Sequence, residues 1–124
     1  MSRRSGRKAA EKGGRRAESL AALWLGLKFY RVLGRRVRTP AGEIDLVALS
    51  PRGTLCLVEV KARTDESAAA EAISPRQRER IARAAELYIA ARPALRHKAV
   101  RFDAILVSPN RLPRHLKDVW RPDG

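Results

Sequence analysis

The chain has 124 residues, of which 44% are hydrophobic and 5% aromatic, so it suits one globular domain with an aliphatic core and not a disordered chain. Lys and Arg number 27 against 13 Asp and Glu, and the resulting formal net charge of +14 favours nucleic acid as a partner, in an enzyme, a binding module or a ribosome-associated protein. One cysteine and two histidines exclude an internal disulfide and a Cys/His zinc site, and they fit a reducing cytoplasm.

The N-terminal segment 1–13 is rich in Arg, Lys, Gly and Ser without apolar periodicity. This composition predicts a flexible basic arm, followed by a single domain over 14–124. The apolar run at 20–27 lacks a small-residue cleavage site and is far shorter than the ~20 residues that span a bilayer. We therefore expect no membrane segment and a cytoplasmic protein.

A helix is predicted from about Gly14 to Lys28. Apolar residues recur at the spacing of three and four typical of an amphipathic helix, namely Leu20, Leu23, Trp24 and Leu27. Glu18 belongs to a second apolar stripe with Ala21, Ala22 and Leu25. We therefore expect the Glu18 carboxylate to face the sheet rather than water.

Strands are predicted over 30–37, with Gly34 as a possible bulge, and over 43–49, 54–63 and 100–107, with a short edge element at the end. Ser74 and Pro75 are typical of a helix N-terminus, and Pro93 ends that helix. Its buried stripe is expected at Ile81, Ala84, Ala85 and Tyr88. The order of elements predicts an α/β sandwich around a mixed central β-sheet flanked by helices.

The hairpin between the second and third strands places two carboxylates opposite each other. Pro51 and Gly53 suit a three-residue loop, so that Ser50 faces Thr54 and Asp45 faces Glu59. A two-residue loop would put the two carboxylates on opposite faces instead. Lys61 follows Glu59 by two and shares its face, so three charges converge in strands that are otherwise hydrophobic.

Two carboxylates on adjacent strands can hold Mg²⁺, and a lysine beside them can orient water and stabilise developing negative charge. Each feature also has a purely structural interpretation. A Glu-x-Lys pair is usually a solvated strand face, Asp45 can bond a turn, and Glu18 can interact favourably with the helix dipole. Only the combination favours a metal site.

Two segments resemble the Asp…Glu-x-Lys core of the restriction-endonuclease-like superfamily, Gly42-Glu43-Ile44-Asp45-Leu46 and Val58-Glu59-Val60-Lys61-Ala62-Arg63. Over about residues 14–120 the chain is similar to the small bacterial YraN-type family of that superfamily. Two further segments match this family's opening helix and late strand, Gly14-Arg15-Arg16-Ala17-Glu18-Ser19-Leu20-Ala21 and Arg101-Phe102-Asp103.

The resemblance implies a fold similar to archaeal Holliday-junction resolvases and a Mg²⁺- or Mn²⁺-dependent endonuclease. It implies Asp45 and Glu59 as metal ligands, Lys61 as a catalytic residue and Glu18 as an accessory acid. Nucleic-acid contacts are expected at Arg36, Arg63, Arg76, Gln77 and Arg78. Arg36 stands where the family usually has Asn, which affects the expected substrate contacts and not the metal site. Glu43 and Asp103 are expected to be structural.

The leading hypothesis is therefore a hydrolase that cleaves phosphodiester bonds of DNA, with branched or structured DNA as the expected substrate. DNA is expected over RNA, and a homodimer is implied by fold analogy alone. The rival hypotheses are a non-catalytic nucleic-acid-binding module that keeps the nuclease fold, and a scaffold that binds an acidic protein through the basic arm.

Overall fold

A computed structural model of the protein describes residues 3–62 and 73–122, with side chains from Arg15 onward. Its elements in chain order are α1 (Arg3–Leu27), β1 (Arg31–Thr39), β2 (Gly42–Leu49), β3 (Leu55–Ala62), α2 (Pro75–Ala90), the 3₁₀ turn η3 (Pro93–Leu95), β4 (Val100–Val107) and β5 (Arg114–Trp120).

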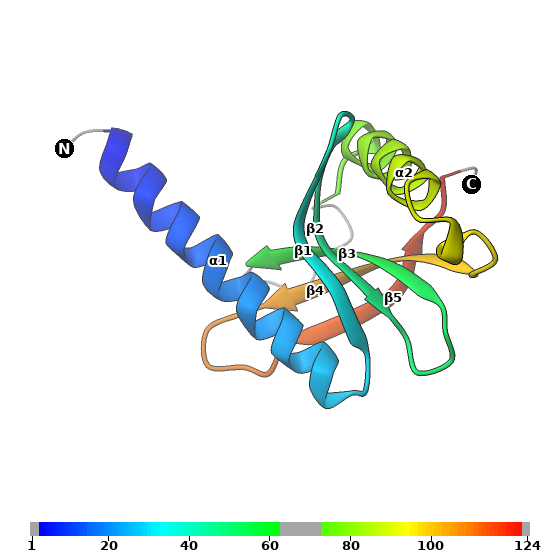
Figure 1. The fold of residues 1–124 in the computed structure, drawn as a ribbon. Coiled ribbons are helices and arrows are strands. Elements are labelled where there is room, and N and C mark those ends of the chain that lie inside the picture. The colour runs from blue at the N-terminus through cyan, green and yellow to red at the C-terminus, as the bar shows by residue number, and fades with distance from the viewer. Residues whose placement is uncertain (1–2, 63–72, 123–124) are drawn as a thin grey trace.

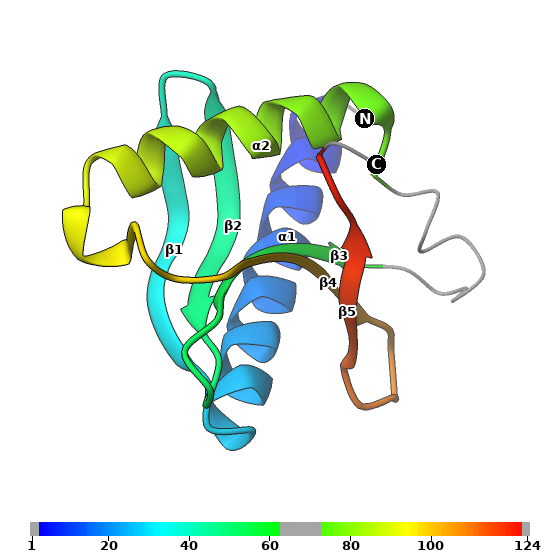
Figure 2. The same cartoon turned by 90° about the vertical axis from the view of Figure 1, so that its right-hand side faces the viewer.

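The five strands form one mixed sheet in the order β1-β2-β3-β4-β5. The β3–β4 pair is parallel and the other three pairs are antiparallel, because α2 crosses over between β3 and β4. Helices α1 and α2 cover opposite faces of this sheet (Figures 1 and 2). The predicted α/β sandwich is confirmed, and the architecture is consistent with a restriction-endonuclease-like fold.

Helix α1 starts earlier than predicted, and only one of its two apolar stripes is buried. It begins at Arg3 and not near Gly14, so residues 3–13, expected to be an arm, continue the helix and project beyond the sheet (Figure 1). The stripe that includes Leu23 is largely exposed, whereas the stripe through Glu18, Ala21 and Leu25 is buried against the sheet as predicted, together with Ala17. Small alanine side chains let the helix backbone approach the sheet closely, which the larger leucines would prevent.

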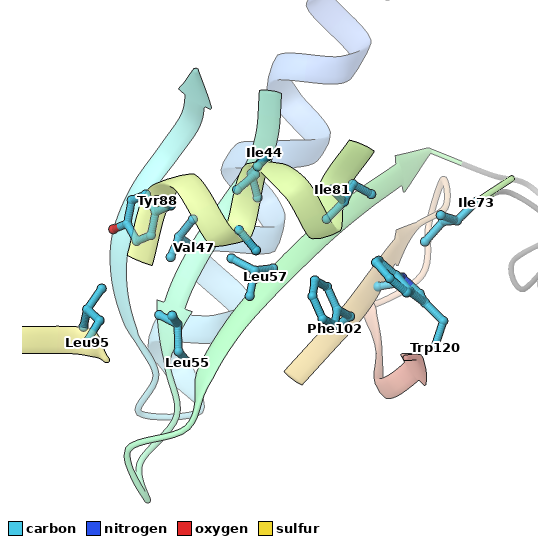
Figure 3. Packing of buried hydrophobic residues seen from close by; sticks show 13 residues of the cluster. Ile44, Val47, Leu55, Leu57, Ile73, Ile81, Tyr88, Leu95, Phe102 and Trp120 are labelled. Carbon is cyan, nitrogen blue, oxygen red and sulfur yellow. The ribbon is translucent and has the colours of Figure 1, made fainter. Parts of the chain in front are cut away.

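Helix α2 forms as the sequence predicts. The Ser74 hydroxyl accepts a hydrogen bond from the Gln77 amide at 3.2 Å, Pro75 is the first helical residue, and the predicted stripe is buried. That stripe packs on one face of the sheet with Leu57, Phe102 and Trp120 (Figure 3). The other face packs Cys56, Val58 and Ile105 against α1. Cys56, the single cysteine of the chain, is therefore buried.

The predicted hairpin register is also confirmed. Leu49 pairs with Leu55 and Leu46 with Val58, the Ser50 amide donates to the Thr54 carbonyl at 2.9 Å, and Gly53 adopts a φ of 88°. The register of β1 shifts between Val32 and Gly34, as a bulge requires. Across the described ranges 3–62 and 73–122, no helix combines the length and apolar character needed to cross a membrane.

Candidate functional site

A pocket of about 370 Å³ lies where β2 and β3 part. Their backbone pairing ends at Leu46–Val58, one pair before Asp45 and Glu59 would face each other. Both helices reach this gap although they cover opposite faces of the sheet, since Glu18 of α1 and Gln77 of α2 line the same pocket. The lining is Glu18, Gly42, Glu43, Asp45, Glu59, Val60, Lys61, Gln77, Arg80 and Ile81.

The Asp45 carboxylate is held by the backbone of the neighbouring strand. Its Oδ2 accepts a hydrogen bond from the Val60 amide at 2.9 Å. This side-chain bond connects β2 and β3 just beyond the end of their backbone ladder. It satisfies an amide that would otherwise lack a partner, and it fixes the orientation of Asp45 toward Glu59.

Glu59 is almost fully buried, with 4% of its surface exposed. Burial, a hydrogen bond with the Asp45 carboxyl group and the Asp45 charge raise the pKa of Glu59 to about 10. The Lys61 charge acts in the opposite direction, and the Glu18 charge adds to the rise. Glu59 is therefore protonated at neutral pH, and it interacts electrostatically with three other charged side chains, those of Asp45, Lys61 and Glu18.

Glu18 is buried and faces the sheet, as its stripe on the helix predicts. The Arg36 guanidinium donates from Nε to Glu18 Oε2 at 2.6 Å. This hydrogen bond and the nearby charges of Glu43 and Asp45 raise the pKa of Arg36, although burial opposes the rise. Arg36 therefore interacts electrostatically with three carboxylates of the pocket, those of Glu18, Glu43 and Asp45. Its backbone adopts the left-handed conformation, with a φ of 49°.

The structure adds Arg80 to the pocket, a residue that the sequence analysis did not single out. Arg80 follows Gln77 by three on α2 and precedes the buried Ile81 by one. This spacing could have identified Arg80 from the sequence, because residues three and four apart share a helix face and Gln77 was already a predicted contact. Within the described ranges, the charged residues of the pocket are four acids and two cations, namely Glu18, Glu43, Asp45, Glu59, Lys61 and Arg80.

Comparison with known proteins shows to which family this chain is related. The sequence profile described as "Uncharacterised protein family UPF0102" matches residues 17–107. A UPF0102 protein of Parvibaculum lavamentivorans is 54% identical over 114 residues, which are 92% of this chain and 85% of that protein. One of Sphingopyxis alaskensis is 47% identical over 116 residues, 94% and 98% of the two chains. This chain belongs to the UPF0102 family.

The UPF0102 match begins one residue before Glu18 and ends at Val107, the last residue of β4. It therefore includes every residue that lines the pocket, together with the hairpin and α2. Strand β5 lies beyond the matched segment. The resemblance to a YraN-type family, based on the segments around Asp45 and Glu59, is confirmed as membership of UPF0102.

Of the other predicted contact residues, Arg76 and Arg78 do not line this pocket. Arg76 lines a neighbouring surface pocket with Arg80 and Arg83, and Arg78 donates from Nε to the Ile73 carbonyl at 3.2 Å. Arg63 lies outside the described residues.

Asp103, expected to be structural, is fully buried and accepts hydrogen bonds from Arg101, His115 and the Asp118 amide.

The carboxyl oxygens of Asp45 and Glu59 suit Mg²⁺ better than Ca²⁺ or Zn²⁺, because the latter two ions would need more ligands from the protein. Over the described residues, no three Asp, Glu, His or Cys side chains are grouped closely enough to ligate one ion. Mg²⁺ typically takes one or two carboxylates and keeps several waters, which the Asp45–Glu59 pair permits. A cation at this pair would replace the proton of Glu59, because its charge would favour the ionised form of that side chain.

Proposed function

We propose that this UPF0102 protein is a metal-dependent endonuclease that hydrolyses phosphodiester bonds of DNA. The observation that carries the proposal is the convergence of Asp45, Glu59 and Lys61 on one pocket, at a gap in the sheet that helices from both faces reach. The formal net charge of +14 supports a polyanionic substrate. By analogy with the fold, branched or structured DNA is the preferred substrate, and a homodimer would cut two strands.

In this proposal, Asp45 and Glu59 hold the metal ion, which supplies Lewis-acid polarisation of the phosphate and a lower pKa for an attacking water. The Val60 amide keeps the Asp45 carboxylate oriented. Lys61 orients the attacking water and stabilises the negative charge that develops on the phosphate oxygens. Glu18, fixed by Arg36, contributes an accessory acid at the edge of the pocket.

A non-catalytic nucleic-acid-binding module is the second candidate. One observation favours it, namely that Asp45 already has a structural role through its bond with the Val60 amide. A substitution experiment separates the two candidates. Asp45→Asn keeps an oxygen acceptor for that amide and removes the charge that a metal ion needs.

We expect Asp45→Asn to lose metal-dependent DNA cleavage by at least about 100-fold, because two-carboxylate metal sites depend on both charges. Glu86→Gln is the matched control, since it removes an exposed carboxylate of α2 that does not line this pocket. Equal cleavage by wild type and Asp45→Asn would overturn the nuclease. Binding without cleavage in all three proteins would support the binding module.

A further inference from the structure

A second pocket, of about 480 Å³, lies at the opposite end of the β2–β3 hairpin. There the end of α1 and the hairpin loop come together at the lower end of the molecule (Figure 2). Among the residues that the structure describes, four cations and no carboxylate line it, and the cations are Lys28, Arg52, Arg101 and Lys117. Tyr30 and the loop residues Ser50 and Pro51 complete most of the remaining wall.

A buried network fixes one side of this pocket. Arg101 donates from Nε and Nη2 to the two Asp103 oxygens at 2.8 Å, and also from Nη2 to the Tyr30 hydroxyl at 2.9 Å. The Tyr30 hydroxyl thus accepts one bond, and its own proton remains available to a ligand. Arg101 and Asp103 compensate each other's charge.

Lys28 is held by the same network. Its Nζ lies 2.9 Å from His115 Nδ1, and His115 Nε2 lies 2.8 Å from Asp103 Oδ2. Because an ammonium group only donates, Nδ1 accepts the bond from Lys28 and the Nε2–H donates to Asp103. Burial first, and then the charge of Lys117, lower the pKa of Lys28. The positive charges at this pocket therefore repel one another.

The remaining two cations have no such partner. Within the described part of the chain, neither Arg52 nor Lys117 forms an ion pair, and both side chains are exposed. Lys28, Arg52 and Lys117 together leave an uncompensated positive charge around one hydroxyl donor. An anion with several acceptor oxygens would relieve this repulsion.

We propose that this pocket binds a phosphate group of the nucleic-acid backbone, at a fixed distance from the carboxylate pocket. The inference rests on the proposed nucleic-acid substrate and identifies where that substrate is anchored. Glu59 and Thr54 are five residues apart on the β3 side, roughly 17 Å at 3.3 Å per residue. Glu18 and Lys28 are ten residues apart along α1, roughly 15 Å. This separation spans about four to five base pairs along a duplex axis.

The test measures binding of a labelled DNA duplex to the full chain in EDTA, at salt concentrations from about 50 to 200 mM. We expect Arg52→Ala and Lys117→Ala each to weaken binding and to reduce the slope of log affinity against log salt by about 0.9, the contribution of one phosphate contact. Arg96→Ala removes an exposed cation at the end of η3 that lines neither pocket, and it should leave the slope unchanged. Arg52→Lys should restore most of the slope.

A second arm distinguishes the source of the phosphate. Inorganic phosphate is titrated into wild type and Arg52→Ala, and the NMR signals of Tyr30 and His115 are followed. Phosphate binding in wild type with an unchanged DNA salt slope in Arg52→Ala would assign the pocket to a free anion and overturn the proposal. Unchanged slopes without phosphate binding would overturn it as well. Because the DNA-binding arm requires no cleavage, a protein that binds with the expected slopes and never cuts would contradict only the nuclease.

Discussion

Glu18 of α1 and Gln77 of α2 belong to helices on opposite faces of the sheet, yet both line the pocket at the Asp45–Glu59 pair. This is possible because β2 and β3 stop pairing after Leu46 and Val58. A continuous sheet would separate the two helices by its full thickness. The end of the ladder therefore creates the site, and the bond from the Val60 amide to Asp45 stabilises that end.

The hydrogen bond from the Val60 amide to Asp45 should make the two Asp45 variants differ in stability. Asp45→Ala leaves the Val60 amide without its acceptor, and we expect a loss of about 1–3 kcal/mol in the free energy of unfolding. Asp45→Asn retains an acceptor and should lose less than about 1 kcal/mol. Urea unfolding measures both values. Equal losses in the two variants would contradict this role of the Val60 amide.

The buried face of α1 predicts an unusual order of sensitivity. Ala21 is fully buried, so Ala21→Leu overpacks the contact with the sheet and should cost about 1–3 kcal/mol. Leu23 has 61% of its surface exposed, so Leu23→Gln should change the free energy of unfolding by no more than about 0.5 kcal/mol. Chemical unfolding of both variants measures the two losses. A larger loss for Leu23→Gln than for Ala21→Leu would show that α1 buries the stripe of Leu23 and not that of Ala21.

Asp103 makes stability dependent on acid pH. Burial alone raises the pKa of Asp103, but hydrogen bonds from His115, Arg101 and the Asp118 amide outweigh it and lower the pKa from 3.8 to about 2. A depressed pKa stabilises the fold above the unfolded value, and here by about 2–3 kcal/mol. This contribution is lost as the pH falls from about 4 to 2.

The comparison of Asp103→Asn with wild type measures the effect. At neutral pH the variant leaves charged donors around a buried amide, and we expect it to lose about 3–5 kcal/mol. The difference between the two proteins should shrink as the pH approaches 2. Asp118→Asn is the control, because Asp118 is exposed and should show little effect. A difference between Asp103→Asn and wild type that is independent of pH would contradict the assigned pKa.

Cys56 should react slowly in the folded protein. Burial, followed by the charge of Asp103, raises the pKa of the Cys56 thiol from 9.0 to about 11. The fraction of thiolate at pH 8 is then about 100-fold lower than in the unfolded chain. Because the folded state disfavours the thiolate, this group lowers stability as the pH rises above about 9. Alkylation rates with and without urea measure the effect, and equal rates would show an accessible thiol.

Local rules predicted most of the fold from the sequence. The turn chemistry of Pro51 and Gly53 fixed the hairpin register, and Ser74 with Pro75 marked the start of α2. The stripe through Glu18 and Ala21 predicted the orientation of the acidic side chain.

Features that depend on packing between distant segments were not predictable in this way. Helix α1 carries two apolar stripes, and only its contact with the sheet decides that the stripe through Ala21 is buried. The end of the β2–β3 ladder depends on strand divergence, which residue spacing does not encode. The pocket at Lys28 requires β5 to bring His115 and Lys117 beside the end of α1, an arrangement of tertiary structure alone.

Cleavage of a substrate panel by the wild-type protein is a direct test of the proposed nuclease activity. The panel contains linear duplex, single strand, flap, four-way junction and RNA hairpin, each with Mg²⁺, with Mn²⁺ and with EDTA. We expect metal-dependent cleavage of at least one DNA substrate, lost in EDTA and in Asp45→Asn. Cleavage that persists in EDTA or in Asp45→Asn, or no cleavage of any substrate with either metal, would contradict it.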